Sequence, residues 1–177
     1  MQIGNSSVDD YSHLICLHGS ESNSNSGKAR LFREWFPGML TPDFTGSFHQ
    51  RMAQLRSILS DKTDWTLIGS SYGGLMGTVF TLDHEAQVRK LVLLAPALRL
   101  DPLASRSQLR PVSVPTIIIH GTADEVVPLE PVREIAQSLF TDLTYFVVDD
   151  GHRLQEAVHE LDWKKYWPET SPCEHMY

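Results

Sequence analysis

Short apolar runs alternate with amphipathic segments along most of the chain. The runs are rich in branched residues and end near Gly, Pro or Asp; they are His13–Leu17, Gly38–Pro42, Trp65–Gly69, Lys90–Ala95, Pro115–His120 and Leu143–Asp149. The amphipathic segments show helical spacing and are Lys28–Phe36, Phe48–Ser60, Gly74–Asp83, Pro131–Phe140 and Leu154–Tyr166. Because runs such as Leu91–Leu94 are apolar on both faces, they suit a parallel sheet that is covered on both sides. The pattern predicts an α/β fold with a mostly parallel sheet of about six strands and helices on both faces.

The length of the chain favours a single domain. We expect residues 1–177 to form that domain, with residues 168–177 as a loosely held tail. A domain of this size buries enough surface to fold without a metal or a disulfide. Cys16 lies in an apolar run and Cys173 lies near the end, so both are expected to be free thiols.

The charge balance excludes two classes of partner. With 15 Lys and Arg against 22 Asp and Glu, the formal net charge is −7, whereas nucleic acids and anionic membranes both require a basic face. No window approaches 18 consecutive apolar residues, so no transmembrane helix is predicted. The first ten residues have neither a basic start nor an apolar stretch, and the expected location is therefore cytoplasmic.

A glycine-flanked serine stands between an apolar run and a helical pattern. In the segment Gly69-Ser70-Ser71-Tyr72-Gly73-Gly74, Ser71 has glycine two residues before and two residues after it, as the G-x-S-x-G turn of a nucleophile elbow requires. Ser70 has Ile68 and Tyr72 at those positions, so Ser71 is the predicted nucleophile. The alternative is a glycine-rich turn that only packs a helix close to a sheet.

An acid and a base follow Ser71 in the order that this architecture requires. A serine needs a base to remove its proton, and the base needs a third group to hold its tautomer. Asp124 follows one apolar run and His152 follows the next, which gives the order Ser, Asp, His. Glu125 is an adjacent alternative to Asp124. For His152 the alternative is an exposed loop histidine, and Asp149 and Asp150, which are closer to it in sequence, are expected to end the strand and cap the turn.

The segment after the first apolar run is expected to receive the negative charge that develops on the substrate oxygen. Such an oxyanion hole needs two backbone N–H groups, one from the residue after the nucleophile and one from this first loop. We assign these donors to Tyr72 and Ser20, with Glu21 as the alternative to Ser20. His18 is expected to be a structural hydrogen-bonding residue, and Gly19 to let the backbone approach the substrate.

Motifs for nucleotides and metals are incomplete. Gly27-Lys28 resembles part of a phosphate-binding loop, but Ser22 stands where the first glycine belongs and Ala29 where Ser or Thr is needed. The chain has no His pair with zinc-ligand spacing and no cluster of cysteines. The sequence therefore implies no cofactor and no metal.

These motifs together resemble the α/β-hydrolase superfamily from about Leu14 to His152. The resemblance rests on His18-Gly19, the Ser71 turn, the segment His120-Gly121-Thr122-Ala123-Asp124-Glu125-Val126-Val127-Pro128, and Gly151-His152. Within the superfamily, Leu17-His18-Gly19, Gly27–Phe32 and Pro42-Asp43-Phe44 are similar to small, capless bacterial esterases of the YqiA-like kind. The resemblance implies a Ser-Asp-His triad that acts on esters or thioesters.

The expected activity is hydrolysis of a small or short-acyl ester or thioester through an acyl-enzyme. The 19 residues from Pro96 to Val114 leave room for one short helix and no cap domain, so we expect an open site that favours small-molecule substrates. The alternatives are a non-catalytic binding protein of the same fold, and an acyltransferase or perhydrolase with the same triad. Either a monomer or a homodimer is compatible with the sequence.

Overall fold

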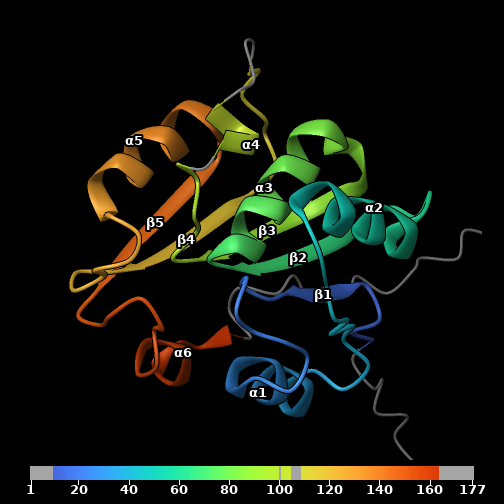
Figure 1. The fold of residues 1–177 in the computed structure, drawn as a ribbon, viewed down its shortest axis with the longest axis horizontal. Helices are drawn as coiled ribbons and strands as arrows, with labels where there is room; N and C mark the ends of the chain where they lie inside the picture. The colour runs from blue at the N-terminus through green and yellow to red at the C-terminus, as the bar shows by residue number, and fades with distance from the viewer. Residues whose placement is uncertain (1–9, 100, 105–108, 164–177) are drawn as a thin grey trace, which may run out of the picture.

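Five parallel strands form the centre of the computed structural model, which describes residues 10–99, 101–104 and 109–163 (Figure 1). The predicted tail at 168–177 lies outside the described residues. The strands are β1 (Leu14–Leu17), β2 (Trp65–Ser70), β3 (Val88–Leu94), β4 (Thr116–Gly121) and β5 (Leu143–Val148). They lie in chain order across the sheet, and every neighbouring pair is parallel. All five carboxyl ends therefore meet at one edge of the sheet.

Helices cover both faces of the sheet, as the pattern predicts. On one face lie α1 (Gly27–Trp35) and α6 (Ala157–Glu160), whose buried residues pack on Cys16, Ile68 and Val92. On the other face lie α2 (Phe48–Leu59), α3 (Tyr72–Asp83), α4 (Asp101–Ala104) and α5 (Leu129–Leu139), which pack on the alternate strand residues such as Leu67 and Leu91 (Figure 1). Successive strand residues point to opposite faces, so the two hydrophobic cores alternate along each strand.

Local sequence explains where the first two helices begin. The hydroxyl of Ser26 accepts a hydrogen bond from the N–H of Ala29 at the start of α1. At the start of α2, Ser47 and Gln50 each accept a hydrogen bond from the backbone N–H of the other, which forms a capping box. These bonds satisfy N–H groups that a helix start leaves without partners.

The run Gly38–Pro42 does not form the expected sixth strand. Leu40 makes a single parallel bridge with Ile15 at the edge of β1, and the sheet has five strands in the described part of the chain. Two features limit the pairing: Gly38 has a φ of +97°, and Pro42 lacks the N–H that a longer ladder would use. The composition of Gly38–Pro42 indicates an apolar segment at the sheet edge, but it does not predict how many of its residues pair with β1.

The last helix is shorter than the segment Leu154–Tyr166 predicts. Leu154 has a φ of +49°, and α6 is confined to four residues; residues 164–166 lie outside the described part. Trp163 is 4% exposed and packs edge-on against Phe32 of α1. The apolar residues of this segment therefore cover the core without continuing the helix.

Between β3 and β4 the described residues contain one helix, the four-residue α4. This agrees with the expectation that no cap domain is present. Within the same described ranges, no helix is both long enough and apolar enough to cross a membrane.

Candidate active site

Ser71 occupies a strained turn between β2 and α3. Its φ is +53° and its ψ is −113°, a conformation that residues with a side chain rarely adopt. Close packing on both sides accounts for the flanking glycines. A Cβ at Gly69 would lie 2.6 Å from the carbonyl oxygen of Gly73, and a Cβ at Gly73 would overlap the carbonyl of Leu17. The two glycines thus let the helix start directly against β1 and β2, with Ser71 at the sheet edge.

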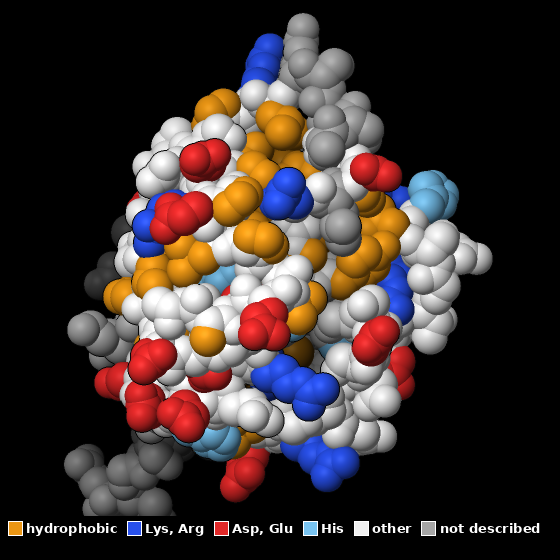
Figure 2. All heavy atoms as spheres, turned by 60° about the vertical axis from the view of Figure 1, so that its left-hand side comes forward, with side chains coloured by type: hydrophobic (Ala, Val, Ile, Leu, Met, Phe, Trp, Pro, Cys, Tyr) orange, Lys and Arg blue, Asp and Glu red, His pale blue; other side chains and the backbone are white. Residues whose placement is uncertain are grey.

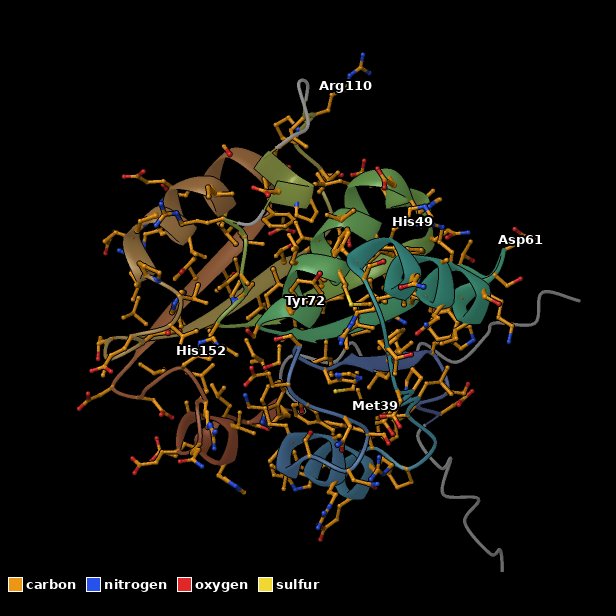
Figure 3. The ribbon with its side chains drawn as sticks, viewed as in Figure 1. Met39, His49, Asp61, Tyr72, Arg110 and His152 are labelled. Carbon is orange, nitrogen blue, oxygen red and sulfur yellow. The ribbon has the colours of Figure 1, made fainter. Side chains whose placement is uncertain are left out.

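His152 connects Ser71 to Asp124 through two hydrogen bonds. Its Nε2 atom lies 3.1 Å from the Ser71 hydroxyl, and its Nδ1 atom lies 2.8 Å from Oδ2 of Asp124. Because an ionised carboxylate only accepts hydrogen bonds, Nδ1 carries the proton and Nε2 accepts from the serine. Figure 3 shows His152 in the loop between β5 and α6, and Tyr72 at the start of α3. The three predicted residues thus come from loops after β2, β4 and β5.

The Asp124 side chain is completely buried and has four hydrogen-bond or ion-pair partners. Its Oδ1 atom accepts from the N–H groups of Val126 and Val127 at 2.9 and 2.7 Å, and its Oδ2 atom faces both His152 and the Nε2 atom of His120. Burial alone would raise the pKa of Asp124, but the hydrogen bonds from Val127, His152 and Val126 outweigh it and lower the pKa. The group is therefore held as a carboxylate.

In the described part of the chain, no hydrogen bond or ion pair joins the other nearby acids to His152. Glu125 is exposed, and no hydrogen bond joins it to the histidine within the described residues. Asp149 accepts a hydrogen bond from Thr122. Asp150 accepts from the N–H groups of Gly151, Glu156 and Ala157 and so fixes the turn that carries His152. Their positions agree with the expected roles at the strand end and turn.

Two other strand-end histidines have structural partners. His120 is fully buried, with Nε2 2.9 Å from the carbonyl of Val127 and Nδ1 2.8 Å from the Tyr145 hydroxyl. The N–H of Phe44 donates to Nε2 of His18 at 2.9 Å, so Nδ1 of His18 donates to the carbonyl of Gly19 at 2.7 Å. Because the peptide bond is planar and trans, this bond directs the N–H of Ser20 away from His18.

The loop after β1 lies beside Ser71, and Arg51 of α2 forms a hydrogen bond to it. A Cβ at Gly19 would lie 3.6 Å from the Cβ of Ser71. Arg51 of α2 donates to the carbonyl of Ser20 at 3.3 Å and lies over the Tyr72 ring, 5.4 Å from its centroid. One nitrogen of this buried guanidinium, Nη1, has no hydrogen-bond partner within the described residues. Arg51 therefore touches both residues that the sequence assigns to the oxyanion hole.

Sequence reasoning did not identify Arg51 or Lys28 as parts of this region. Lys28 donates to the hydroxyl of Ser70, next to Ser71, at 3.2 Å, and burial lowers the pKa of its ammonium group. Each is a basic residue on an amphipathic helix, and such residues usually face solvent. No signal in the sequence of α2 distinguishes Arg51, and the esterase resemblance of the segment with Lys28 gives that residue no role.

The cysteine on β1 is not a competing nucleophile. Cys16 is buried, and burial raises the pKa of its thiol to about 12. A thiol with so high a pKa forms almost no thiolate at neutral pH. Among the described residues, no group of three or more His, Cys, Asp or Glu could hold a metal ion.

A small pocket lies next to Ser71 and Asp124. It has a volume of about 230 Å³ and is lined by Ala97, Arg99, Val126, Val127 and Pro128. The N–H of Ala97 donates to the carbonyl of Ser71 at 3.0 Å, and Val126 and Val127 hold Asp124, as described above. The pocket is smaller than the usual range of ~300–1,000 Å³ for small-molecule sites. Because it is open rather than enclosed, its walls contact only part of a bound group.

Comparison with known proteins identifies a family and a fold. Residues 17–155 match the family described as "Serine hydrolase (FSH1)". The curated proteins include no match to this chain.

Solved structures of α/β hydrolases share the fold. An α/β-superfamily hydrolase from Xanthomonas campestris is 28% identical, with a TM-score of 0.68, and the match covers 82% of this chain and 91% of that chain. Mouse alpha/beta hydrolase domain-containing protein 10 is 18% identical, with a TM-score of 0.67 and coverage of 82% and 83%. An esterase from Exiguobacterium antarcticum is 17% identical, with a TM-score of 0.66 and coverage of 83% and 87%.

Proposed function

The chain belongs to the FSH1 family of serine hydrolases, and on that premise we propose that it hydrolyses small or short-acyl carboxylic esters or thioesters. The superfamily resemblance of the sequence agrees with this family, while the narrower YqiA-like grouping stays a prediction. The observation that carries the proposal is the line of hydrogen bonds from Ser71 through His152 to Asp124. That line pairs a nucleophile with a base and the base with an orienting carboxylate.

In the acylation step, Ser71 attacks the substrate carbonyl and His152 accepts its proton at Nε2. Asp124 holds the imidazole in the productive tautomer and stabilises the imidazolium that forms. The imidazolium then protonates the leaving alcohol or thiol, and the acyl group stays on the Ser71 oxygen. In the deacylation step, His152 removes a proton from the water that attacks the acyl-enzyme, and it returns this proton to the Ser71 oxygen as the acyl bond breaks and the acid leaves.

The N–H groups of Tyr72 and Ser20 receive the negative charge on the carbonyl oxygen. The φ of Ser71 supports this assignment, because the strained turn exposes the serine at the start of α3, where Tyr72 is the first helical residue. For Ser20, support comes from the bond between His18 and the Gly19 carbonyl, which turns the adjoining N–H away from the core. Glu21 is the alternative donor in the same loop.

The proposed preference for small substrates rests on the size of the pocket beside Ser71. At about 230 Å³ the pocket is smaller than most small-molecule sites, and it is open rather than enclosed, so its walls can contact a short substituent but not surround a long one. Four of the five lining residues are apolar, which favours contact with a short hydrocarbon chain.

The neighbouring serines provide a direct test of this function. We expect Ser71→Ala to abolish turnover of 4-nitrophenyl acetate and labelling by a fluorophosphonate probe, while Ser70→Ala keeps both. Ser70 is the matched control because it adjoins Ser71 but faces Lys28. Wild-type protein that neither turns over esters nor reacts with the probe would instead indicate a non-catalytic binding protein. Analysis of the products in the presence of added alcohols or peroxide separates hydrolysis from acyl transfer.

A further inference from the structure

The pocket beside Ser71 contains one charged side chain among apolar ones. Ala97, Val126, Val127 and Pro128 supply its apolar lining, and Arg99 supplies a guanidinium. Figure 2 brings forward the side of the molecule that carries α5 and β5, where hydrophobic side chains gather between acidic and basic ones. The combination gives the pocket an apolar wall and a cationic group.

Both walls of the pocket are bonded to residues of the proposed triad. Ala97 donates its N–H to the Ser71 carbonyl, and Val127 donates its N–H to the Asp124 carboxylate. The pocket therefore lies close to the backbone of Ser71 and to the carboxylate of Asp124, and we take it as the place toward which one substituent of a carbonyl carbon at Ser71 extends. Val126 is 67% exposed, which is high for a large hydrophobic residue. Contact with a substrate chain would remove this apolar surface from water.

The charge of Arg99 is available to a ligand. Its guanidinium forms no ion pair within residues 10–99, 101–104 and 109–163, whereas Arg89 pairs with Asp64 and Arg133 pairs with Glu130. An arginine binds a carboxylate through two parallel, charge-assisted hydrogen bonds. The chain as a whole has a net charge of −7, so a cation beside the site locally offsets the repulsion that an anionic substrate would otherwise meet.

We propose that Arg99 selects substrates in which a short apolar chain next to the ester or thioester ends in a carboxylate. This inference rests on the proposed hydrolase function and specifies its substrate class. The pocket, with a volume of about 230 Å³, suits a short chain of a few carbons that ends in a carboxylate. The carbonyl carbon of an ester has two substituents, the acyl chain and the leaving group. Either of them can extend into this pocket, so the carboxylate belongs to one of the two.

The test compares esters with and without a carboxylate group at the end of one substituent. Mono-4-nitrophenyl glutarate carries the carboxylate on the acyl part, 4-(butyryloxy)benzoate carries it on the leaving group, and 4-nitrophenyl butyrate and phenyl butyrate are the neutral references. In the wild type we expect kcat/KM for one charged ester to exceed that of its neutral reference by about tenfold, the size of one charge-assisted contact. The charged ester whose kcat/KM exceeds that of its neutral reference shows which part of the substrate contacts Arg99.

Variants separate the role of Arg99 from the general effect of charge. We expect Arg99→Gln to bring the ratio of charged to neutral ester close to one, and Arg99→Glu to reverse it. Arg110→Gln is the matched control, because Arg110 is exposed and lines a different hollow with Leu82 and Val112; it should keep the wild-type ratio. A wild-type ratio of one, or a ratio that Arg99→Gln leaves unchanged, would overturn the inference. Wild-type turnover of 4-nitrophenyl butyrate tests the hydrolase function separately from this preference.

Discussion

The Nε2 atom of His120 lies 3.2 Å from Oδ2 of Asp124, and both side chains are completely buried. The same nitrogen lies 2.9 Å from the carbonyl of Val127, so its proton is shared between the two oxygens. The Nδ1 atom then accepts from the hydroxyl of Tyr145. His120 thus contacts the same carboxylate oxygen of Asp124 as His152 does.

Replacing this support is expected to reduce catalysis without removing it. In the His120→Asn variant, Asp124 keeps its bonds to Val126, Val127 and His152 but loses its fourth partner. We expect kcat/KM to fall by about tenfold, which is about 1.4 kcal/mol of transition-state stabilisation. Steady-state kinetics on a neutral ester measures the effect. Unchanged kinetics would show that three partners are sufficient to position Asp124.

Asp124 also predicts how stability changes with pH. Its pKa in the folded protein is lowered from the ordinary value of 3.8, so the carboxylate stabilises the fold above that value. This contribution declines as pH falls from about 3.8 through the lower pKa of the folded state. Urea unfolding between pH 6 and pH 3 should therefore show the stability advantage of wild type over Asp124→Asn shrinking toward acid pH. A difference that is constant over this range would contradict the lowered pKa.

At neutral pH the Asp124→Asn variant is also expected to lose up to ~10⁴ in kcat.

Arg51 is expected to affect activity and stability in different directions. It is a buried cation that forms no ion pair in the described part of the chain, and such a charge is costly to bury. Arg51→Met should therefore leave the free energy of unfolding unchanged or raise it. The same change frees the Ser20 carbonyl and is expected to lower kcat by about tenfold with little change in KM, less than the ~10²–10³ of a lost oxyanion donor.

Arg51→Lys provides the control for this prediction, because it keeps the charge but not the geometry of the guanidinium. We expect it to recover part of the lost kcat. Affinity for a boronic acid inhibitor, which resembles the tetrahedral intermediate, should follow kcat across the three proteins. If stability and activity instead fall together in Arg51→Met, the residue has a structural role alone.

Gly73, two residues after Ser71, is expected to tolerate no side chain. A Cβ at Gly73 would overlap the carbonyl of Leu17, and relief would require the start of α3 to move away from β1. We expect Gly73→Ala to lose about 3 kcal/mol or more of stability, measured by chemical unfolding. Gly27→Ala is the control, since a Cβ there meets nothing within 4 Å at the start of α1. That change should be neutral or stabilise by up to about 1 kcal/mol.

The parts of the fold and site that depend on local pattern are predictable from the sequence. The glycines around Ser71 indicate a tight turn because their spacing reflects close backbone packing, and the Ser, Asp, His order follows from strands that end at one edge. The edge segment Gly38–Pro42 and the interrupted helix after Leu154 are less predictable, because apolar residues pack on a core equally well outside regular structure. In both places the backbone leaves the regular conformation through a positive φ.

The positions of the side chains that surround the candidate site could not be predicted from the sequence. Arg51 reaches Ser20 across 31 positions of sequence, and Lys28 reaches Ser70 across 42. Neither pair shares an element or a motif, so only the packing of α2 and α1 against the sheet brings them together. The position of Arg99 was equally unpredictable, because its place in the pocket depends on the path of the chain after β3.

The sequential order of the five strands has a consequence for biosynthesis. A ribosome delivers β1 first and β5 last, so the sheet can extend in one direction as each strand emerges. The turn with Ser71 is complete after the second strand, but His152 follows the fifth and requires Asp150 and α6 to fix its loop. A nascent chain consequently holds Ser71 without its proposed base while the 81 positions up to His152 are added, and the hydrogen bonds from Ser71 to Asp124 can form only after the final strand has joined the sheet.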